Sequence, residues 1–307
     1  MSKKAFLFPG QASQYVGMGS DLYERYAIAR EMFKKANDIL EFDITSLCFD
    51  GPAEELKQTR NTQPAIFLHS IIVTTILREL GILPGMTAGH SLGEYSALVA
   101  AGAISFEHGL KLVRQRGMLM QVAGEISPGT MAAIIGLSYE DVKNICAEAE
   151  QQGIVTVANL NSPGQIVISG SIEGVHKAME LAKEQGAKRA IELVVSGAFH
   201  SPLMESSQEE FKNSLDQAEI KNAEIPVYAN VTAQPVQNAA EIKKLLFEQL
   251  TNPVLWETSA RAMLKDNATE FFEVGPGNVL AGLQKRIDRS VQVKTVGKVD
   301  EIQTLET

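Results

Sequence analysis

The chain has 307 residues, of which 45% are apolar and 21% are charged, as in an ordinary globular protein. This length is more than one small core needs, so the sequence predicts one large domain with an insertion, or two domains. The formal net charge of −9 argues against a general nucleic-acid-binding surface, and no nucleic-acid partner is expected.

The sequence has no segment typical of export or membrane insertion. The first apolar run, residues 5–8, is shorter than the ~7–15 apolar residues of a signal peptide. The longest uncharged stretch, residues 61–77, falls short of the ~20 residues of a membrane span and predicts a buried helix. We therefore predict a cytoplasmic protein without membrane contact.

Cys48 and Cys146 are the only cysteines, and each lies between apolar residues. Two isolated cysteines in a chain without an export signal are typical of reduced core residues. No cluster of Cys and His has the spacing of a metal site, so the sequence predicts no metal.

Short apolar strands alternate with helical periodicity along both ends of the chain, which indicates a mostly parallel sheet covered on both faces. Pro64 fits the first turn of one of these helices. The predicted strands are 4–8, 86–88, 227–230, 271–274 and 291–296. The predicted helices are 22–40, 54–57, 63–80, 92–101, 105–122, 205–218, 240–250, 256–267 and 279–286.

The middle of the chain has a different pattern, which begins after Ser127-Pro128-Gly129. Its predicted elements are strand 131–137, helix 139–151, strands 154–159 and 165–169, helix 172–185 and strand 189–195. This βαββαβ order is that of a ferredoxin-like unit. We therefore predict an inserted small subdomain, 129–195, within a large α/β domain formed by residues 1–128 and 196–307.

Gly89-His90-Ser91-Leu92-Gly93 matches the G-x-S-x-G nucleophile elbow. In such a turn the serine stands between a strand and a helix, and the helix directs its first amides at the hydroxyl. The flanking glycines remove side chains that would clash. The predicted strand before this motif and helix after it favour a catalytic Ser91 over an incidental serine in a turn.

A serine nucleophile needs a base within hydrogen-bond reach, and His200 is the candidate. It lies in a predicted loop between Gly197 and Pro202, where a rigid scaffold commonly presents catalytic groups. The other four histidines are predicted to lie in the core or at its boundary, to point away from the elbow, or to be solvated: His69, His90, His108 and His176.

No acidic residue between Ser91 and His200 fits a Ser–Asp/Glu–His order, since Asp141 falls inside the predicted insertion. We therefore favour a Ser–His dyad whose imidazole is oriented by a neutral group such as a main-chain carbonyl. Glu192 stays open as an alternative.

Arg116 flanks the apolar stripe of the predicted helix 105–122 and adjoins Gly117, where another backbone can approach. A buried guanidinium is best paired with a carboxylate. The residue pattern leaves two interpretations open, a structural salt bridge or a receptor for a substrate carboxylate.

Six motifs now stand in order along nearly the whole chain. They are Phe8-Pro9-Gly10-Gln11-Ala12-Ser13-Gln14, the elbow, Arg116-Gly117 with Met120-Gln121, the loop 197–202, Gln249 with Asn252-Pro253-Val254, and Glu273-Val274-Gly275-Pro276-Gly277. This set resembles the malonyl-CoA:acyl carrier protein transacylases of bacterial fatty acid synthesis. The family fold, a hydrolase-like α/β domain with an inserted ferredoxin-like subdomain, agrees with the predicted elements.

The resemblance implies a role for each of four residues in acyl transfer. Ser91 is then the nucleophile, and His200 is the general base and acid. Gln11, as a side-chain donor, and the main-chain N–H of Leu92 form the oxyanion hole.

Three further roles follow from the same resemblance. Arg116 becomes the clamp for the malonyl carboxylate, and the backbone carbonyl of Gln249 orients the histidine. Phe199 corresponds to the bulky residue of malonyl-selective members. Ala12 departs from the glycine that is frequent in the family, and no loss is expected from this small side chain.

The resemblance thus implies transfer of malonyl from malonyl-CoA to the phosphopantetheine thiol of an acyl carrier protein, through an acyl-Ser91 enzyme, for fatty acid biosynthesis. No cofactor is expected, because the partner carries the phosphopantetheine, and the enzyme is expected to be a monomer. The alternatives are an acyltransferase of a polyketide assembly line, a serine thioesterase or esterase, and an inactive carrier-binding module.

A carrier protein is normally acidic, so an acidic enzyme needs a local basic patch to bind it. Two groups of basic residues are candidates for this patch. Each group has a second interpretation, as an ordinary charged surface exposed to solvent. One lies on the predicted insertion, at Lys177, Lys183, Lys188 and Arg189, and the other near the C-terminus, at Lys285, Arg286 and Arg289.

Overall fold

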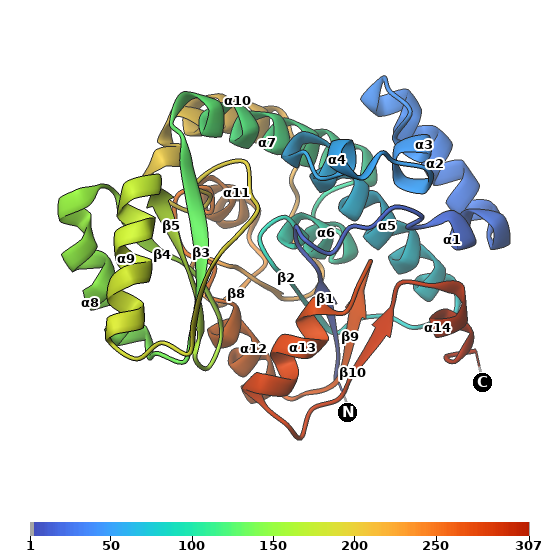
Figure 1. The fold of residues 1–307 in the computed structure, drawn as a ribbon. Helices are drawn as coiled ribbons and strands as arrows, with labels where there is room; N and C mark the ends of the chain where they lie inside the picture. Colours follow the sequence, from blue (N-terminus) through green and yellow to red (C-terminus); the bar gives the residue numbers. More distant parts are fainter. Residues whose placement is uncertain (1–2, 307) are drawn as a thin grey trace.

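A six-stranded, mostly parallel sheet organises both ends of the chain in the computed structural model, which describes residues 3–306 (Figure 1). The strand order is β10-β9-β1-β2-β7-β8, and only β8 runs antiparallel to its neighbour. The strands are β1 Lys3–Phe8, β2 Met86–Gly89, β7 Val227–Tyr228, β8 Pro235–Val236, β9 Ala268–Val274 and β10 Val293–Val296.

Helices cover both faces of this sheet, as the alternation of apolar strands and helices predicts. Side chains of successive strand residues point to opposite faces. In β1, Phe6 and Phe8 belong to the core of one face, while Ala5 and Leu7 belong to that of the other. The first face packs on α2 Ala27–Leu40, α5 Thr59–Glu79, α6 Gly93–Ala100 and α7 Phe106–Ile126, and the second on α12 Trp256–Lys265 and α13 Val279–Ile287.

The predicted helix 22–40 is two helices in the structure, α1 Ser20–Arg25 and α2. Tyr26 between them is extended, with φ −114° and ψ 129°. The guanidinium of Arg30 donates to the carbonyls of Tyr23 and Glu24, at 2.9 and 3.1 Å. These bonds satisfy carbonyls that a helix end leaves free, so a side chain supports a break that no Gly or Pro marks.

Helix α5 begins at Thr59, four residues before the predicted start, so Pro64 lies inside it and not in its first turn. Proline has no N–H to donate to the carbonyl four residues earlier. That carbonyl belongs to Arg60, and it accepts a bond of 2.6 Å from Arg114 of α7. The neighbouring helix thus satisfies the group that Pro64 leaves unpaired.

Shorter helices connect these elements: α3 Ile44–Phe49, α4 Ala53–Leu56, η2 Pro202–Ser207, α10 Gln208–Gln217, α11 Ala239–Glu248 and α14 Val299–Gln303. None of the helices within residues 3–306 is long and apolar enough to cross a membrane.

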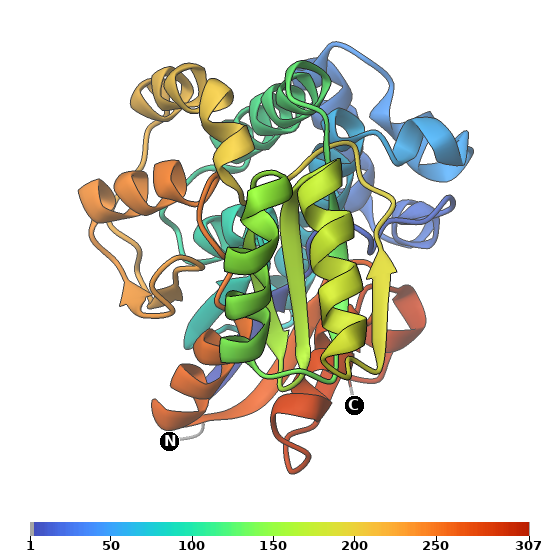
Figure 2. The ribbon, with the colours of Figure 1, turned by 60° about the vertical axis from the view of Figure 1, so that its left-hand side comes forward.

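The middle of the chain forms a second, antiparallel sheet of order β4-β5-β3-β6. This order of strands and helices is the predicted split βαββαβ arrangement. Two helices cover one face of this sheet, as Figure 2 shows, and the opposite face joins the main core through Met131 and Val167. The elements are β3 Gly129–Ile135, α8 Tyr139–Ala149, η1 Glu150–Gln152, β4 Val155–Ser162, β5 Gln165–Ser171, α9 Ile172–Glu184 and β6 Arg189–Glu192. The exact domain boundaries stay a prediction.

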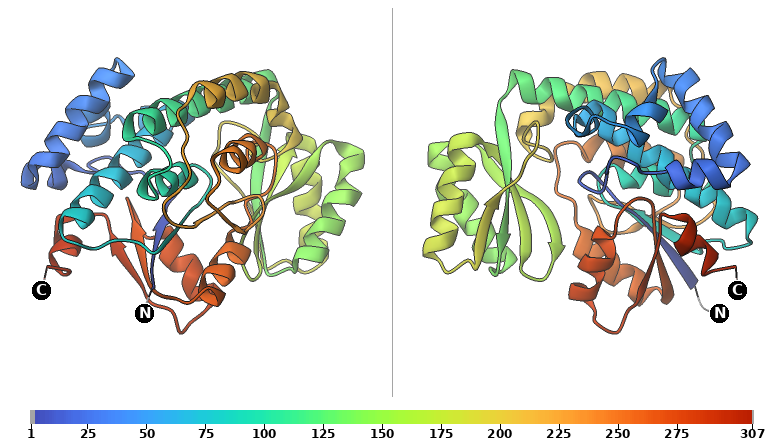
Figure 3. Two further views of the ribbon diagram at one scale, coloured as in Figure 1. Left: turned by 180° about the vertical axis from the view of Figure 1, so that it is seen from behind. Right: turned by 45° about the vertical axis from the view of Figure 1, so that its right-hand side comes forward.

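Two stretches of chain connect the second sheet to the rest of the molecule, one through α7 and one through the segment after β6 (Figure 3). They meet at Gly124 of α7. A β-carbon at this position would lie 2.0 Å from the carbonyl oxygen of Ser196. The close approach of helix and segment therefore requires a residue without a side chain.

Gly124→Ala should lower the free energy of unfolding by about 1–3 kcal/mol, since the added methyl group overpacks this crossing. Gly282→Ala is the matched control in α13, where a β-carbon meets nothing within 4 Å and φ is not positive. It should raise stability by about 0.5–1 kcal/mol through helix propensity. Urea unfolding measures both, and equal effects of the two variants would contradict the packing argument.

Candidate active site

The nucleophile elbow lies between the end of β2 and the start of α6. Ser91 has φ 51°, in the left-handed region that a nucleophile elbow imposes on its serine. The turn admits no side chain at either flanking glycine. A β-carbon on Gly89 would lie 1.9 Å from the carbonyl carbon of Gly93, and one on Gly93 would lie 2.1 Å from the carbonyl oxygen of Phe8.

Asn230 fixes this strained turn from the neighbouring strand, and the sequence alone did not identify it. It follows β7 and is buried; its Oδ1 accepts the N–H of Ser91 at 2.7 Å, and its Nδ2 donates to the carbonyl of Gly89 at 2.7 Å. The available signal was its position, because a polar residue at the carboxyl end of a strand beside β2 lies next to the elbow.

His200 lies against the nucleophile, in the loop that returns from the second sheet. Its Nε2 is 2.8 Å from Ser91 Oγ, and its Nδ1 is 2.8 Å from the main-chain carbonyl oxygen of Gln249. A carbonyl accepts only, so Nδ1 carries the proton and Nε2 is the acceptor for the serine hydroxyl. Glu192 does not orient the ring, because its carboxylate bonds to His176 and Thr130.

The surroundings of His200 keep its imidazole neutral. Burial, and next the charge of Arg116, lower the pKa of His200 to about 3, against the opposing bond to the Gln249 carbonyl. A neutral imidazole at ordinary pH can accept the serine proton, as a general base must.

Arg116 is only 1% exposed and reaches the nucleophile from α7. Its Nη2 donates to Ser91 Oγ at 3.0 Å and to Gln249 Oε1 at 2.9 Å, and its Nη1 donates to Gln63 Oε1 at 2.9 Å. Among the ion pairs of residues 3–306, none involves Arg116, and its Nε has no hydrogen-bond partner there. The guanidinium thus keeps donor capacity beside the hydroxyl.

Gln11 lies in the loop after β1, next to the elbow, since a β-carbon on Gly10 would lie 2.5 Å from the carbonyl oxygen of His90. Its side-chain amide donates to Thr59 Oγ1 at 3.2 Å. One N–H of the Gln11 side chain is therefore bonded within the protein, and its role in the oxyanion hole stays a prediction. In the described part of the chain, the main-chain N–H groups of Gln11 and Leu92 have no hydrogen-bond partner, whereas that of Ser91 is bonded to Asn230.

Ala12, beside Gln11, has φ 81°, a conformation that glycine adopts without strain. The alanine that replaces the family's frequent glycine is therefore strained, by about 1–2 kcal/mol. Its side chain is exposed, so it does not crowd the site.

None of the side chains of the other four histidines bonds to the nucleophile in the described part of the chain. His90 turns away from the elbow, and its Nε2 lies 2.8 Å from Asn161 Oδ1. His69 is fully buried in the core, His176 pairs with Glu192 on the surface, and His108 lines a separate cavity.

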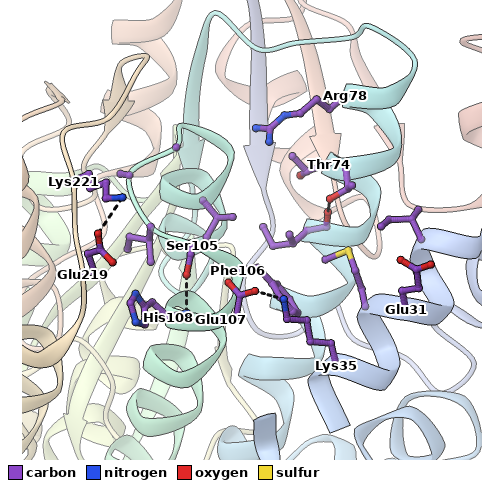
Figure 4. Close-up of a pocket in the computed structure, with 18 residues that line it drawn as sticks. Glu31, Lys35, Thr74, Arg78, Ser105, Phe106, Glu107, His108, Glu219 and Lys221 are labelled. Carbon is purple, nitrogen blue, oxygen red and sulfur yellow. Dashed lines mark hydrogen bonds and ion pairs between the residues drawn. The ribbon is translucent and has the colours of Figure 1, made fainter. Parts of the chain in front are cut away.

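That cavity, of about 530 Å³, opens between α2, α5 and α7, away from the site (Figure 4). Its rim carries two ion pairs, Lys35 with Glu107 and Lys221 with Glu219. None of Ser91, His200 and Arg116 lines it. It is therefore distinct from the group of residues around the nucleophile.

Comparison with known proteins agrees with this geometry. The family model described as an acyl transferase domain matches residues 5–303. The chain belongs to this family. A malonyl CoA-acyl carrier protein transacylase of Bacillus subtilis is 50% identical over 100% of this chain and 96% of its own length.

Solved structures extend the likeness to the whole fold. The crystal structure of an acyl carrier protein S-malonyltransferase from Vibrio cholerae has a TM-score of 0.96 and 43% identity, covering 99% of this chain and 100% of that one. A complex of a type II PKS acyl-carrier protein with its malonyl-transacylase has a TM-score of 0.96 and 40% identity, covering 99% and 98%. The predicted α/β class is thus confirmed.

Asn230→Ala should slow the reaction of Ser91 with a fluorophosphonate, a reagent for activated serine hydroxyls, because the elbow loses the side chain that fixes it. The variant should also lose about 2–4 kcal/mol of stability, since two buried backbone groups lose their partners. Asn238→Ala is the control, because this exposed residue caps α11 and is expected to cost about 1 kcal/mol. An unchanged labelling rate in Asn230→Ala would refute the role of Asn230.

Proposed function

We propose that the chain is a malonyl-CoA:acyl carrier protein transacylase, which transfers malonyl through a covalent acyl-Ser91 intermediate. The observation that supports this most strongly is that one hydroxyl, Ser91 Oγ, bonds both to the base His200 and to the buried cation Arg116. The base makes the serine a nucleophile. The cation fits an acyl group that ends in a carboxylate.

In the first half-reaction, His200 Nε2 takes the proton of Ser91 as Oγ attacks the thioester carbonyl carbon of malonyl-CoA. The free N–H groups of Leu92 and Gln11 bind the resulting oxyanion, and such donors each contribute on the order of 10²–10³ in rate. The carbon–sulfur bond then breaks, and His200 returns its proton to the leaving coenzyme A thiolate. Malonyl remains as an ester on Ser91.

In the second half-reaction, the phosphopantetheine thiol of the carrier protein gives its proton to His200 and attacks this ester. The carbon–oxygen bond breaks, and Ser91 regains the proton. The Gln249 carbonyl holds the imidazole in one tautomer for both transfers. Arg116 binds the malonyl carboxylate throughout.

We propose fatty acid biosynthesis as the pathway, since nearly the whole sequence resembles the transacylases of bacterial fatty acid synthesis. The polyketide assembly line is the other candidate, favoured by the likeness to a transacylase solved with a type II PKS acyl-carrier protein. Preference between carrier proteins of the two kinds tests this. The cytoplasmic location and the monomeric state stay predictions.

Arg116→Ala should reduce acylation of Ser91 by malonyl-CoA by on the order of 10²–10³, since the variant leaves a substrate carboxylate unpaired in a buried site. Acylation by acetyl-CoA should change far less. Mass spectrometry of the protein after brief exposure to each thioester measures both. The unmodified enzyme should form a stable acyl-enzyme that discharges to a thiol.

Two outcomes would contradict this proposal. Rapid release of free malonate by the unmodified enzyme would indicate a thioesterase, and failure to form any acyl-enzyme would indicate an inactive carrier-binding module. An unchanged malonyl preference in Arg116→Ala would refute the clamp alone. Ser91→Ala is the control, and it should form no acyl-enzyme with either thioester.

The charge distribution favours one of the two basic groups as the carrier-binding surface. Lys285, Arg286 and Arg289 surround a hollow of about 560 Å³ near Pro163, and within the described residues none of the three forms an ion pair. In the second group, Lys188 and Arg189 also lack an ion pair within the described residues, but acidic side chains surround the two lysines of α9. Lys177 pairs with Glu180, and Lys183 lies beside Glu180, Glu184 and Glu192. We propose the first group as the docking surface.

Lys285→Glu with Arg286→Glu should raise the KM for the phosphopantetheinylated carrier protein by about tenfold, because exposed charge pairs contribute roughly 0.2–1 kcal/mol each and reversal makes them repulsive. The rate of acylation from malonyl-CoA should not change. Lys177→Glu with Lys183→Glu is the matched control. A larger effect of the control pair would place docking on the second sheet instead.

A further inference from the structure

Glu94 is a buried carboxylate beside the nucleophile to which the proposed mechanism gives no role. It stands in the first turn of α6, three residues after Ser91, and is 2% exposed. One of its oxygens, Oε2, accepts two hydrogen bonds, from Gln249 Nε2 at 2.6 Å and from the main-chain N–H of Asn230 at 3.1 Å. Both donors belong to residues that contact the Ser91–His200 pair.

Gln249 connects this carboxylate to the catalytic groups through both ends of its side-chain amide. Its Oε1 accepts from Arg116, while its Nε2 donates to Glu94 and to the main-chain carbonyl of Ser91 at 3.1 Å. The reversed amide would point N–H groups at the guanidinium and an oxygen at the carboxylate. Glu94 therefore fixes which way round the side-chain amide lies in the residue whose main-chain carbonyl holds His200.

The carboxylate of Glu94 also balances the buried charge of Arg116, although the two side chains are joined only through the Gln249 amide. A buried cation is costly without a counter-charge. Glu94 acts on Arg116 across the Gln249 amide, so no carboxylate of the protein occupies the guanidinium itself. No carboxylate of the described residues therefore competes with a substrate carboxylate for the guanidinium, whose Nε has no hydrogen-bond partner there.

We propose that Glu94 is a positioning residue of the transfer reaction: through the Gln249 amide, its ionised carboxylate orients His200 and offsets the charge of Arg116. This proposal rests on the proposed function, since it assigns Glu94 to the acylation of Ser91. Glu94 does not touch the reacting atoms.

The ionisation of Glu94 gives the proposal a distinctive pH dependence. The charged or titratable groups around it are Arg116 on α7, His200 in the returning loop and Tyr95 on its own helix. Burial raises the pKa of Glu94 to about 7, against the hydrogen bonds from Gln249 and Asn230 and the charge of Arg116. The pKa of His200 is about 3, so a rise of the acylation rate near neutral pH comes from Glu94 and not from the base.

The decisive variant is Glu94→Gln, because one amide oxygen can accept both hydrogen bonds that Oε2 accepts, and only the charge is lost. Stopped-flow acylation by malonyl-CoA should rise with pH through about 7 in the unmodified enzyme. In Glu94→Gln the rate should stay near the low acid value at every pH, about tenfold below the unmodified enzyme at alkaline pH. This loss is smaller than the ~10⁴ lost when a group bonded directly to a catalytic histidine is altered, because Glu94 acts through Gln249.

Thermal unfolding of the same proteins separates this effect from misfolding. An unfolded glutamate has a pKa of about 4.5 and Glu94 has one of about 7, so between these values the folded protein holds a proton that the unfolded chain has released. Stability therefore falls as the pH rises through this window, and Glu94→Gln removes the loss. The variant should become more stable relative to the unmodified enzyme with rising pH, while it becomes relatively slower.

Glu273→Gln is the matched control. Burial raises the pKa of Glu273 to about 7 as well, but this residue accepts the N–H groups of Leu280 and Ala281 at the start of α13. It should show the same pH trend in stability and an unchanged pH profile of acylation.

Three outcomes would overturn the proposal. One is a Glu94→Gln enzyme with the rate and pH profile of the unmodified enzyme, and another is an equal loss of rate in Glu273→Gln. Failure of the unmodified enzyme to form an acyl-enzyme would overturn the proposed function and this proposal with it, whereas the first two outcomes leave the proposed function intact.

Discussion

The rest of the site is arranged around a permanently charged guanidinium held beside a serine hydroxyl. Removing Arg116 from water costs several kcal/mol, and no carboxylate within residues 3–306 bonds to it in return. The amide oxygens of Gln63 and Gln249 bond to it instead. The same charge also lowers the pKa of His200, so the cation that fits the substrate helps to keep the base neutral.

The six-stranded sheet explains how distant parts of the chain meet at this point. Strands β1, β2 and β7 are parallel neighbours, so the loops at their carboxyl ends lie together. These loops carry Gln11, Ser91 and Asn230. Arg116, His200 and Gln249 approach from a helix, the returning loop and the end of α11, and none of them could be placed by its distance in sequence from the serine.

Local physics predicted what depends on local sequence. Apolar periodicity gave most strands and helices, and the glycine pattern gave the elbow with Ser91. Among the five histidines, His200 was chosen only because Gly197 and Pro202 predict a loop around it. The roles expected of Gln11 and Gln249 came from the resemblance. A main-chain carbonyl such as that of Gln249 carries no residue-type signal, and the structure bonds the Gln11 side chain to Thr59.

The differences from the prediction arose where side chains distant in sequence satisfy backbone groups. Arg30 supports the helix break at Tyr26, and Arg114 bonds the carbonyl left free by Pro64. Asn230 and Glu94 escaped notice for the same reason, because their partners are backbone groups and an amide far along the chain. Such contacts exist only after folding, so a single sequence does not reveal them.

The join between the two sheets constrains the catalytic pair as strongly as the elbow does. His90 of the elbow bonds to Asn161 of β4, and the segment before α12 pairs with the same strand at Val254. Gly124 holds the returning segment against α7 within a contact that no side chain could enter. His200 lies in this segment at φ 58°, a conformation that a histidine keeps only when its surroundings enforce it. The second sheet thus does more than add a surface. Because these contacts tie it to the large α/β domain, any shift between them would change the distance between Ser91 and His200. A rigid join is therefore a requirement of the chemistry.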